Sequence, residues 1–339
     1  MASIPLDVLL EILPFVDRVD LPAMARSNRY LSHYALDQIY GHIASKHMQA
    51  ACLSTTSNPA LAQRVKFLEL NRAVHGLQLQ AILPFVRDAL RVCSNLQTLK
   101  LDVDGNHSWV LPTGPERGVF KLRAFSCATF ITQDLLEFLR DQDELEDISF
   151  SHSYLFTAER GPPRPWRFPL LKKFEGPMSW IDTIVPNHPV SNITVSYVKA
   201  GAASSLAALE LTTVPIRHLQ IPLHALQDRD LEGLGALFPS LEVLILTVAL
   251  TWPKTTPSAS ILHFVRDLLG VLSTVQIFEI IGFTASNEAE NDSLLHVVQT
   301  ATEKGHPSLR QFSVQYRDGY GTNTSRVYWT KADRGWERQ

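Results

Sequence analysis

The chain has 339 residues, of which 45% are hydrophobic and 19% charged, as expected of a globular protein with a large buried core. Its formal net charge of −3 argues against the basic surface with which proteins bind nucleic acid or an anionic membrane. No apolar run approaches the roughly 18 residues of a membrane-spanning helix. A signal peptide is not expected, because Asp7 and Glu11 interrupt the apolar stretch at the amino end. We therefore expect neither nucleic acid nor a membrane as a partner.

The first forty residues predict three short helices. Ser3 can cap the first helix, whose apolar side chains recur at helical spacing until Pro14 ends it. Asp20 can cap a second helix that runs through Ala25, and a break at Asn28 precedes a third helix that reaches Tyr40. The first of these helices is the unusual one, because it is apolar on almost every side.

The opening helix has more apolar surface than its two small neighbours can cover. Asp7 and Glu11 form a single narrow polar stripe on it. Each large aliphatic side chain left in water forgoes about 1.5–3 kcal/mol of burial. Either later segments of this chain cover the surplus, which would make the helix a plain N-terminal cap, or another protein does.

The segment from Ile4 to Tyr40 resembles an F-box, the three-helix unit with which substrate receptors bind the Skp-type adaptor of cullin-based ubiquitin ligases. Ile4-Pro5-Leu6-Asp7 stands where the family has Leu-Pro-x-Glu, and Asp20-Leu21 matches its Asp-Leu pair. Tyr30 replaces the usual tryptophan, and the ending Ile39-Tyr40 is similar to that of fungal members. The resemblance implies an adaptor-binding surface that comprises Ile4, Pro5, Val8, Leu9, Ile12, Leu13, Leu21 and Ala25.

The rest of the chain repeats a short apolar-x-x-apolar-x-apolar pattern. Its eleven instances begin at Val65, Leu96, Leu122, Leu145, Leu171, Val190, Leu206, Ile216, Leu241, Val275 and Leu309. Alternation within each instance predicts a half-buried strand. Helical patterns lie between instances, most clearly at 77–93, 132–142, 261–272 and 292–304. This order predicts an α/β fold, an irregular leucine-rich-repeat-like solenoid with parallel strands. A doubly wound α/β domain is the competing architecture, although eleven equivalent parallel strands in one open sheet would be unusual for it.

These patterns divide the chain into four predicted segments. Residues 1–45 form the F-box-like unit, 46–63 a helical and polar connector, 64–316 the solenoid and 317–339 a C-terminal hairpin that caps it. The Pro- and Arg-rich stretch 154–170 has no periodicity, and we interpret it as a long exposed loop that is either functional or disordered. The solenoid keeps the first half of the leucine-rich-repeat consensus, while the Asn or Cys that normally follows is mostly absent. It resembles the similarly irregular repeats of divergent fungal F-box proteins.

The predicted strands present one row of side chains to the open face of the solenoid, at the fifth position of the repeat. Four glutamates and one lysine make this row mildly acidic, so a basic segment of a partner protein is favoured. Val243, Ile245, Ile277 and Ile281 add an apolar patch on the same side. The candidate substrate-binding residues are Glu69, Lys100, Glu175, Glu210, Ile245 and Glu279.

No catalytic motif is present in the sequence. There is no Gly-rich phosphate loop, no HExxH, no GxSxG and no metal-ligand spacing among its Cys and His residues. The three cysteines form no CxxC pair, which favours a reducing compartment, either the cytoplasm or the nucleus. We expect no enzyme, no cofactor and no metal site.

Together with the resemblance, these observations predict a substrate-recognition subunit of a cullin-based (SCF-type) ubiquitin ligase, bound through a Skp-type adaptor and carrying an unknown protein substrate. The alternative is a non-catalytic interaction scaffold whose F-box-like segment serves only as an N-terminal cap.

Overall fold

In a computed structural model, the chain forms two compact units. The structure describes residues 8, 11, 15–17, 19–27, 29–44, 48–70, 76–102, 107–113, 120–128, 132–150, 166–197, 206–227, 231–248, 259–284, 295–300, 306, 308–317, 324–332 and 335–338. The first unit comprises Met1–Leu145 with Leu155–Glu159, and the second comprises Glu146–Tyr154 with Arg160–Gln339. Among the described residues, no helix is both long enough and apolar enough to cross a bilayer.

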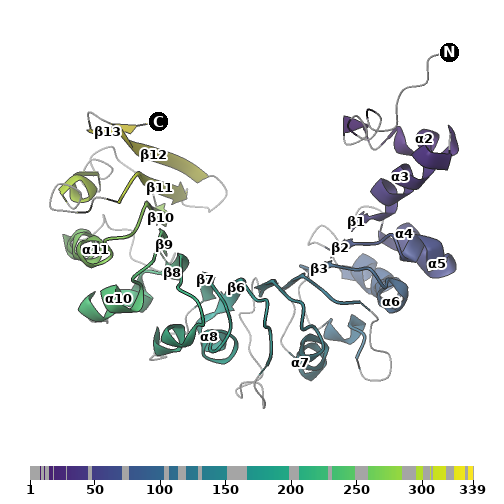
Figure 1. The fold of residues 1–339 in the computed structure, drawn as a ribbon, viewed down its shortest axis with the longest axis horizontal. Coiled ribbons are helices and arrows are strands. Elements are labelled where there is room, and N and C mark those ends of the chain that lie inside the picture. The colour runs from purple at the N-terminus through teal and green to yellow at the C-terminus, as the bar shows by residue number, and fades with distance from the viewer. Residues whose placement is uncertain are drawn as a thin grey trace. The chain divides into compact units, whose positions relative to one another are not determined.

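The first unit alternates helices with short parallel strands. Its elements are α2 (Leu21–Ser27), α3 (Arg29–Tyr40), β1 (His42–Ala44), α4 (Met48–Ser57), α5 (Pro59–Ala62), β2 (Phe67–Leu70), α6 (Gly76–Val92), β3 (Thr98–Leu101), η3 (Ser108–Val110), β4 (Ala124–Cys127) and α7 (Gln133–Arg140). Strands β1 to β4 pair in parallel in the order in which they occur in the chain. Helices α4 to α7 lie along one side of these strands (Figure 1).

The second unit continues the same alternation and ends in antiparallel strands. Its elements are β5 (Asp147–Ser149), β6 (Lys173–Pro177), α8 (Met178–Ile184), β7 (Asn192–Tyr197), η5 (Leu206–Leu211), β8 (His218–Pro222), α9 (His224–Gln227), α10 (Leu231–Leu237), β9 (Val243–Thr247), α11 (Ala259–Val271), β10 (Ile277–Thr284), β11 (Gln311–Arg317), β12 (Thr324–Ala332) and β13 (Gly335–Arg338). Strands β5 to β11 pair in parallel in chain order, whereas β12 and β13 pair antiparallel. Helices α8, α10 and α11 lie on one side of the strands (Figure 1).

This arrangement confirms the α/β class and the parallel, solenoid-like repeat. A doubly wound domain would carry helices on both faces of its sheet, whereas α4 to α7 in the first unit and α8, α10 and α11 in the second lie on one side of their strands. The three-helix F-box unit stays a prediction, because most of its first helix lies outside the described residues.

The repeat pattern builds the core, because its three apolar positions are buried in columns. In the first unit Leu68 aligns with Leu99 and Leu99 with Phe125, and all three side chains are inaccessible to solvent. Hydrogen bonds fix the same register: the carbonyl of Lys66 accepts the N–H groups of Gln97 and Thr98, both at 2.9 Å. The same pairing recurs in the second unit, where the carbonyl of Glu242 accepts the N–H groups of Gln276 and Ile277.

One predicted strand is wrong. The instance that begins at Leu206 forms the 3₁₀ helix η5. Strands β7 and β8 pair directly, with Ile193 beside Leu219, so no place remains for a strand between them. The intervals of 16 and 10 residues around this instance are also too short for a strand, a helix and two turns. Glu210 is consequently exposed on η5 and does not belong to the sheet row in which it was predicted.

Strand β1 was not predicted, and it changes how the first segment is understood. The carbonyl of Gly41 accepts the N–H groups of Lys66 and Phe67, as the equivalent carbonyl does in the later repeats. A Cβ at Gly41 would collide with the carbonyl oxygen of Asp37, so only glycine lets the chain turn so closely from α3 into β1. The last residues of the predicted 1–45 segment therefore belong to the sheet. The limits of the four predicted segments stay predictions.

The antiparallel strands cover the end of the hydrophobic core in the second unit. Strands β11 and β12 pair from Gln311 opposite Thr330 to Arg317 opposite Thr324. The ring of Trp329 stacks on Phe312 at 5.1 Å between centroids, and Phe312 stacks on Phe278 at 5.7 Å. Trp329 therefore covers the last column of the core. The short strand β13 was not predicted.

All three cysteines are buried, and we expect them to be unreactive in the native protein. Cys52, Cys93 and Cys127 are buried free thiols, and burial raises the pKa of Cys52 and Cys93 to about 12. At pH 8 only about one in 10⁴ of such thiols is ionised, and the thiolate is the reactive form. We expect a chromogenic disulfide reagent to label none of the three within minutes in native buffer and all three in guanidinium chloride. Rapid labelling of any of them in the native protein would contradict this burial.

Candidate binding surfaces

The fifth position of each repeat points away from the helices, because the fourth and sixth positions are buried. In the first unit the strand register aligns Ala44, Glu69, Lys100 and Ser126. In the second it aligns Ser149, Glu175, Thr194, Gln220, Ile245, Glu279 and Ser313. Of the candidate substrate-binding residues, five lie in these rows and Glu210 does not. Their role in binding stays a prediction.

In the first unit, the open face carries a cluster of side chains that pair with one another. The ring of His42 meets the edge of Phe67 at 4.2 Å between centroids, and Nζ of Lys100 lies 5.2 Å from the centroid of Phe67. His42 Nε2 lies 3.8 Å from a carboxylate oxygen of Glu69. A cation over an aromatic ring contributes about 0.5–1 kcal/mol at an exposed site. Both predicted charges of this row therefore have partners within the chain.

In the second unit, the open face changes from polar to apolar along the chain. Lys173 and Asp147 form an ion pair of 3.4 Å beside Glu175, which is half-buried. Further along, strands β9 and β10 present half-buried aliphatic side chains, which we call the apolar strip: Val243, Ile245, Ile277 and Ile281. Apolar side chains gathered on an open sheet face favour contact with another protein over contact with water.

Glu279 lies within the apolar strip, and the chain itself covers it. Its side chain is 7% exposed, and Oε2 accepts a 2.8 Å hydrogen bond from Nη2 of Arg326 on β12. Burial raises the pKa of this carboxyl above its usual value, while the Arg326 guanidinium acts in the opposite direction. Glu279 is thus an internally paired carboxylate, whereas the alternation of the sequence placed it on an open surface.

The predicted adaptor-binding residues are only partly described. Ile4, Pro5, Leu9, Ile12 and Leu13 lie outside the described residues. Val8 is helical and 41% exposed, and Ala25 is half-buried on α2. Leu21 is buried within the chain, so its own burial does not support an adaptor contact.

Sequence reasoning missed two of the most exposed apolar side chains near the amino end. Phe15 is 85% exposed and Val19 is 82% exposed. Both lie between the predicted first and second helices. The periodic spacing of apolar residues that predicts the first helix does not extend to them. The adjacent Pro14, which ends that helix, was the available signal for a turn that exposes its neighbours.

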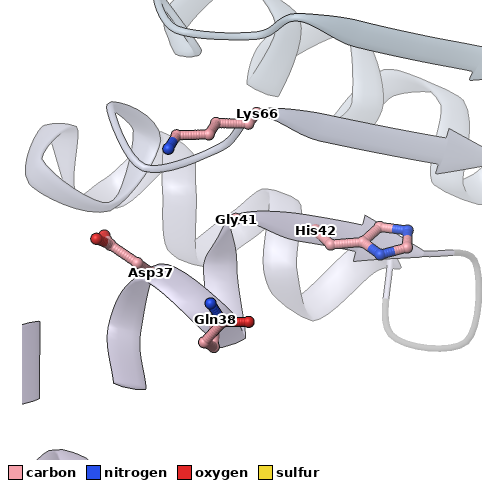
Figure 2. Close-up of a pocket in the computed structure, with 5 residues that line it drawn as sticks. All are labelled: Asp37, Gln38, Gly41, His42 and Lys66. Carbon is pink, nitrogen blue, oxygen red and sulfur yellow. The ribbon is translucent and has the colours of Figure 1, made fainter. Parts of the chain in front are cut away.

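A pocket of about 450 Å³, which no sequence pattern predicts, opens where α3 leads into the first strand. Asp37 and Gln38 of α3, Gly41, His42 and Lys66 line it. Figure 2 shows the His42 ring pointing away from the carboxylate of Asp37. Just outside the pocket, Arg64 donates to Asp37 and, at 3.0 Å, to the carbonyl of His33. These contacts tie α3 to the turn before β2.

The chemistry available on these surfaces is apolar contact, hydrogen bonding and ion pairing. Among the residues that the structure describes, no three His, Cys, Asp or Glu side chains come together as a metal site would require. Comparison of the chain with known protein families gives no match, and comparison with curated proteins finds no similar sequence.

The Asp37–Arg64 pair should stabilise the protein more than an exposed pair does. The Arg64 side chain is only 19% exposed and contacts His33, at its carbonyl and at ring Nδ1, as well as Asp37, whereas Asp88 pairs with Arg91 on the surface of α6. We expect Asp37→Ala to lower the free energy of unfolding by about 1 kcal/mol and the control Asp88→Ala by less than about 0.5 kcal/mol. Urea denaturation followed by far-UV circular dichroism measures both, and equal losses would contradict a tethering role for Arg64.

Proposed function

We propose that this protein is a substrate-recognition subunit of a cullin-based (SCF-type) ubiquitin ligase. Its amino end would bind a Skp-type adaptor, and the open faces of its strands would bind the protein to be ubiquitinated. Ubiquitin transfer would belong to the partner proteins, so the chain itself needs no catalytic group.

The exposed apolar side chains near the amino end are the observation that carries this proposal. Phe15 and Val19 are almost fully exposed and Val8 is partly exposed, although Leu21 of the same segment is buried. Exposing such a side chain forgoes about 1.5–3 kcal/mol, which contact with a second protein would recover. The resemblance to an F-box supplies the identity of that second protein.

The open faces support the second half of the proposal. Each unit presents a row of side chains on the side of its strands that the helices leave uncovered. Parallel strands about 4.8 Å apart form a regular surface that suits an extended segment or the side of a domain. The half-buried apolar strip gives this surface a place for hydrophobic contact.

The alternative is a non-catalytic scaffold whose first helices only cap the repeats. The burial of Leu21 favours it, because a capping helix packs its apolar side chains against its own chain. The two functions differ in one measurable property, which is whether a Skp-type adaptor binds.

A pull-down with purified Skp-type adaptor tests the proposal. We expect the wild-type chain to capture the adaptor and Phe15→Asp to weaken capture at least about 30-fold, since a charged group would replace a central apolar contact. The double variant Leu9→Asp, Ile12→Asp should abolish capture. The control is Leu53→Asp, which changes an exposed leucine on α4 outside the proposed surface and should leave capture unchanged.

Two results would contradict the docking assignment. One is a wild-type chain that captures no adaptor while remaining folded by circular dichroism. The other is equal capture by wild type and by the double variant. Affinity purification with and without residues 1–40 would then identify the partners of a scaffold.

A further inference from the structure

The carboxylate of Glu279 lies in an apolar environment that does not suit a charge. Its neighbours two residues away on the same face of β10 are Ile277 and Ile281, and Ile245 lies directly beside it on β9. The side chain is 7% exposed. A carboxylate in such a place is stable only if a cation and hydrogen bonds compensate for its lost hydration.

The chain supplies that cation from its C-terminal hairpin. Glu279 aligns with Ser313 on β11, and Ser313 aligns with Tyr328 on β12. Arg326 lies two residues before Tyr328 and reaches back across β11, with Nη2 at 2.8 Å from Oε2 of Glu279 and 3.4 Å from Oγ of Ser313. Its guanidinium carbon lies 4.6 Å from the centroid of the Tyr328 ring.

This internal pairing leaves half of the carboxylate unsatisfied. Oε1 of Glu279 is buried and has no hydrogen-bond partner among the described residues. A guanidinium can bind both oxygens of a carboxylate through two parallel N–H groups, yet Arg326 engages one oxygen. The Arg326 side chain is 36% exposed, so it can leave Glu279 for solvent. Arg326 therefore satisfies only one of the two carboxylate oxygens of Glu279.

Building on the proposed function, we propose that the apolar strip with Glu279 binds an extended segment of the target protein in which an arginine is flanked by aliphatic side chains. Arg326 occupies the place of that arginine until the segment binds. The incoming guanidinium displaces Arg326 and binds both oxygens of Glu279, while the flanking aliphatic side chains contact the strip.

The chemistry of the site selects each part of this segment. Arginine is favoured over lysine because its planar fork matches two carboxylate oxygens. Aliphatic neighbours are favoured because Ile245, Ile277 and Ile281 lie beside the carboxylate on β9 and β10. An extended backbone places every second side chain on the same side, so the arginine and the residues two positions away face the sheet together.

A labelled peptide measures this selectivity directly. The probe is fluorescein-Ile-Ser-Arg-Ser-Val-amide, and its matched control carries citrulline, which keeps the shape of arginine without the charge. Binding to the full chain is followed by fluorescence anisotropy. We expect the wild-type protein to prefer arginine over citrulline by about tenfold, since charge-assisted hydrogen bonds of this kind are at stake. Glu279→Gln should abolish the preference, whereas Glu175→Gln, a carboxylate elsewhere on the face, should preserve it.

Removing the internal competitor should strengthen binding. We expect Arg326→Gln to bind the arginine peptide at least about tenfold more tightly than the wild type. The double variant Glu279→Gln, Arg326→Gln leaves no unpaired charge and should show no preference. Thermal unfolding verifies that each variant is folded. If Arg326→Gln does not fold, the loss of the arginine-over-citrulline preference in Glu279→Gln relative to wild type still tests the proposal.

Three results would overturn the proposal: no binding of the arginine peptide to any folded variant at millimolar concentration, an arginine preference that survives Glu279→Gln, or a folded Arg326→Gln variant that binds no more tightly than the wild type. No adaptor is present in this assay. Failure of adaptor capture and failure of arginine selection are therefore separate outcomes.

Discussion

The structure depends on one repeated backbone interaction, in which the carbonyl at the second position of a repeat accepts two N–H groups from the next repeat. The carbonyls of Gly41, Lys66 and Gln97 do this in the first unit. A slip by one residue would turn every apolar column to the open side, because side chains alternate between faces. The hydrogen bonds and the buried columns thus enforce the same register, and that register decides which side chains a partner can reach.

Local pattern was sufficient for most repeats with regular spacing along the chain. Val243–Thr247 and Phe67–Leu70 form strands where alternation predicts them. It was misleading at Leu206, because spacing alone does not reveal that β7 and β8 already pair with each other. It was silent at β1, where Gly41 and a strand of three residues leave too little pattern to recognise. Both differences depend on which neighbour is available for pairing, and a single segment does not contain that information.

The candidate surfaces were predictable in position but not in accessibility. Alternation places Glu279 and Lys100 on the open face, and the register agrees. Arg326, which covers Glu279, lies 47 residues away in the sequence, and Arg64 lies 27 residues from Asp37. Such pairs form only when the chain is folded. The sequence predicts the charge of the side chains on the open face. Tertiary packing decides whether those charges are already paired within the chain.

Internal pairing also determines what kind of binding the open faces can support. Lys173 pairs with Asp147, Lys100 lies over Phe67, and Glu279 holds Arg326. A charge that is paired within the chain attracts less by long-range electrostatics than a free one. Under our proposal for Glu279, a partner replaces an internal contact with a better one of the same geometry. Such a replacement favours selection by sequence over selection by net charge, as the proposed function would require.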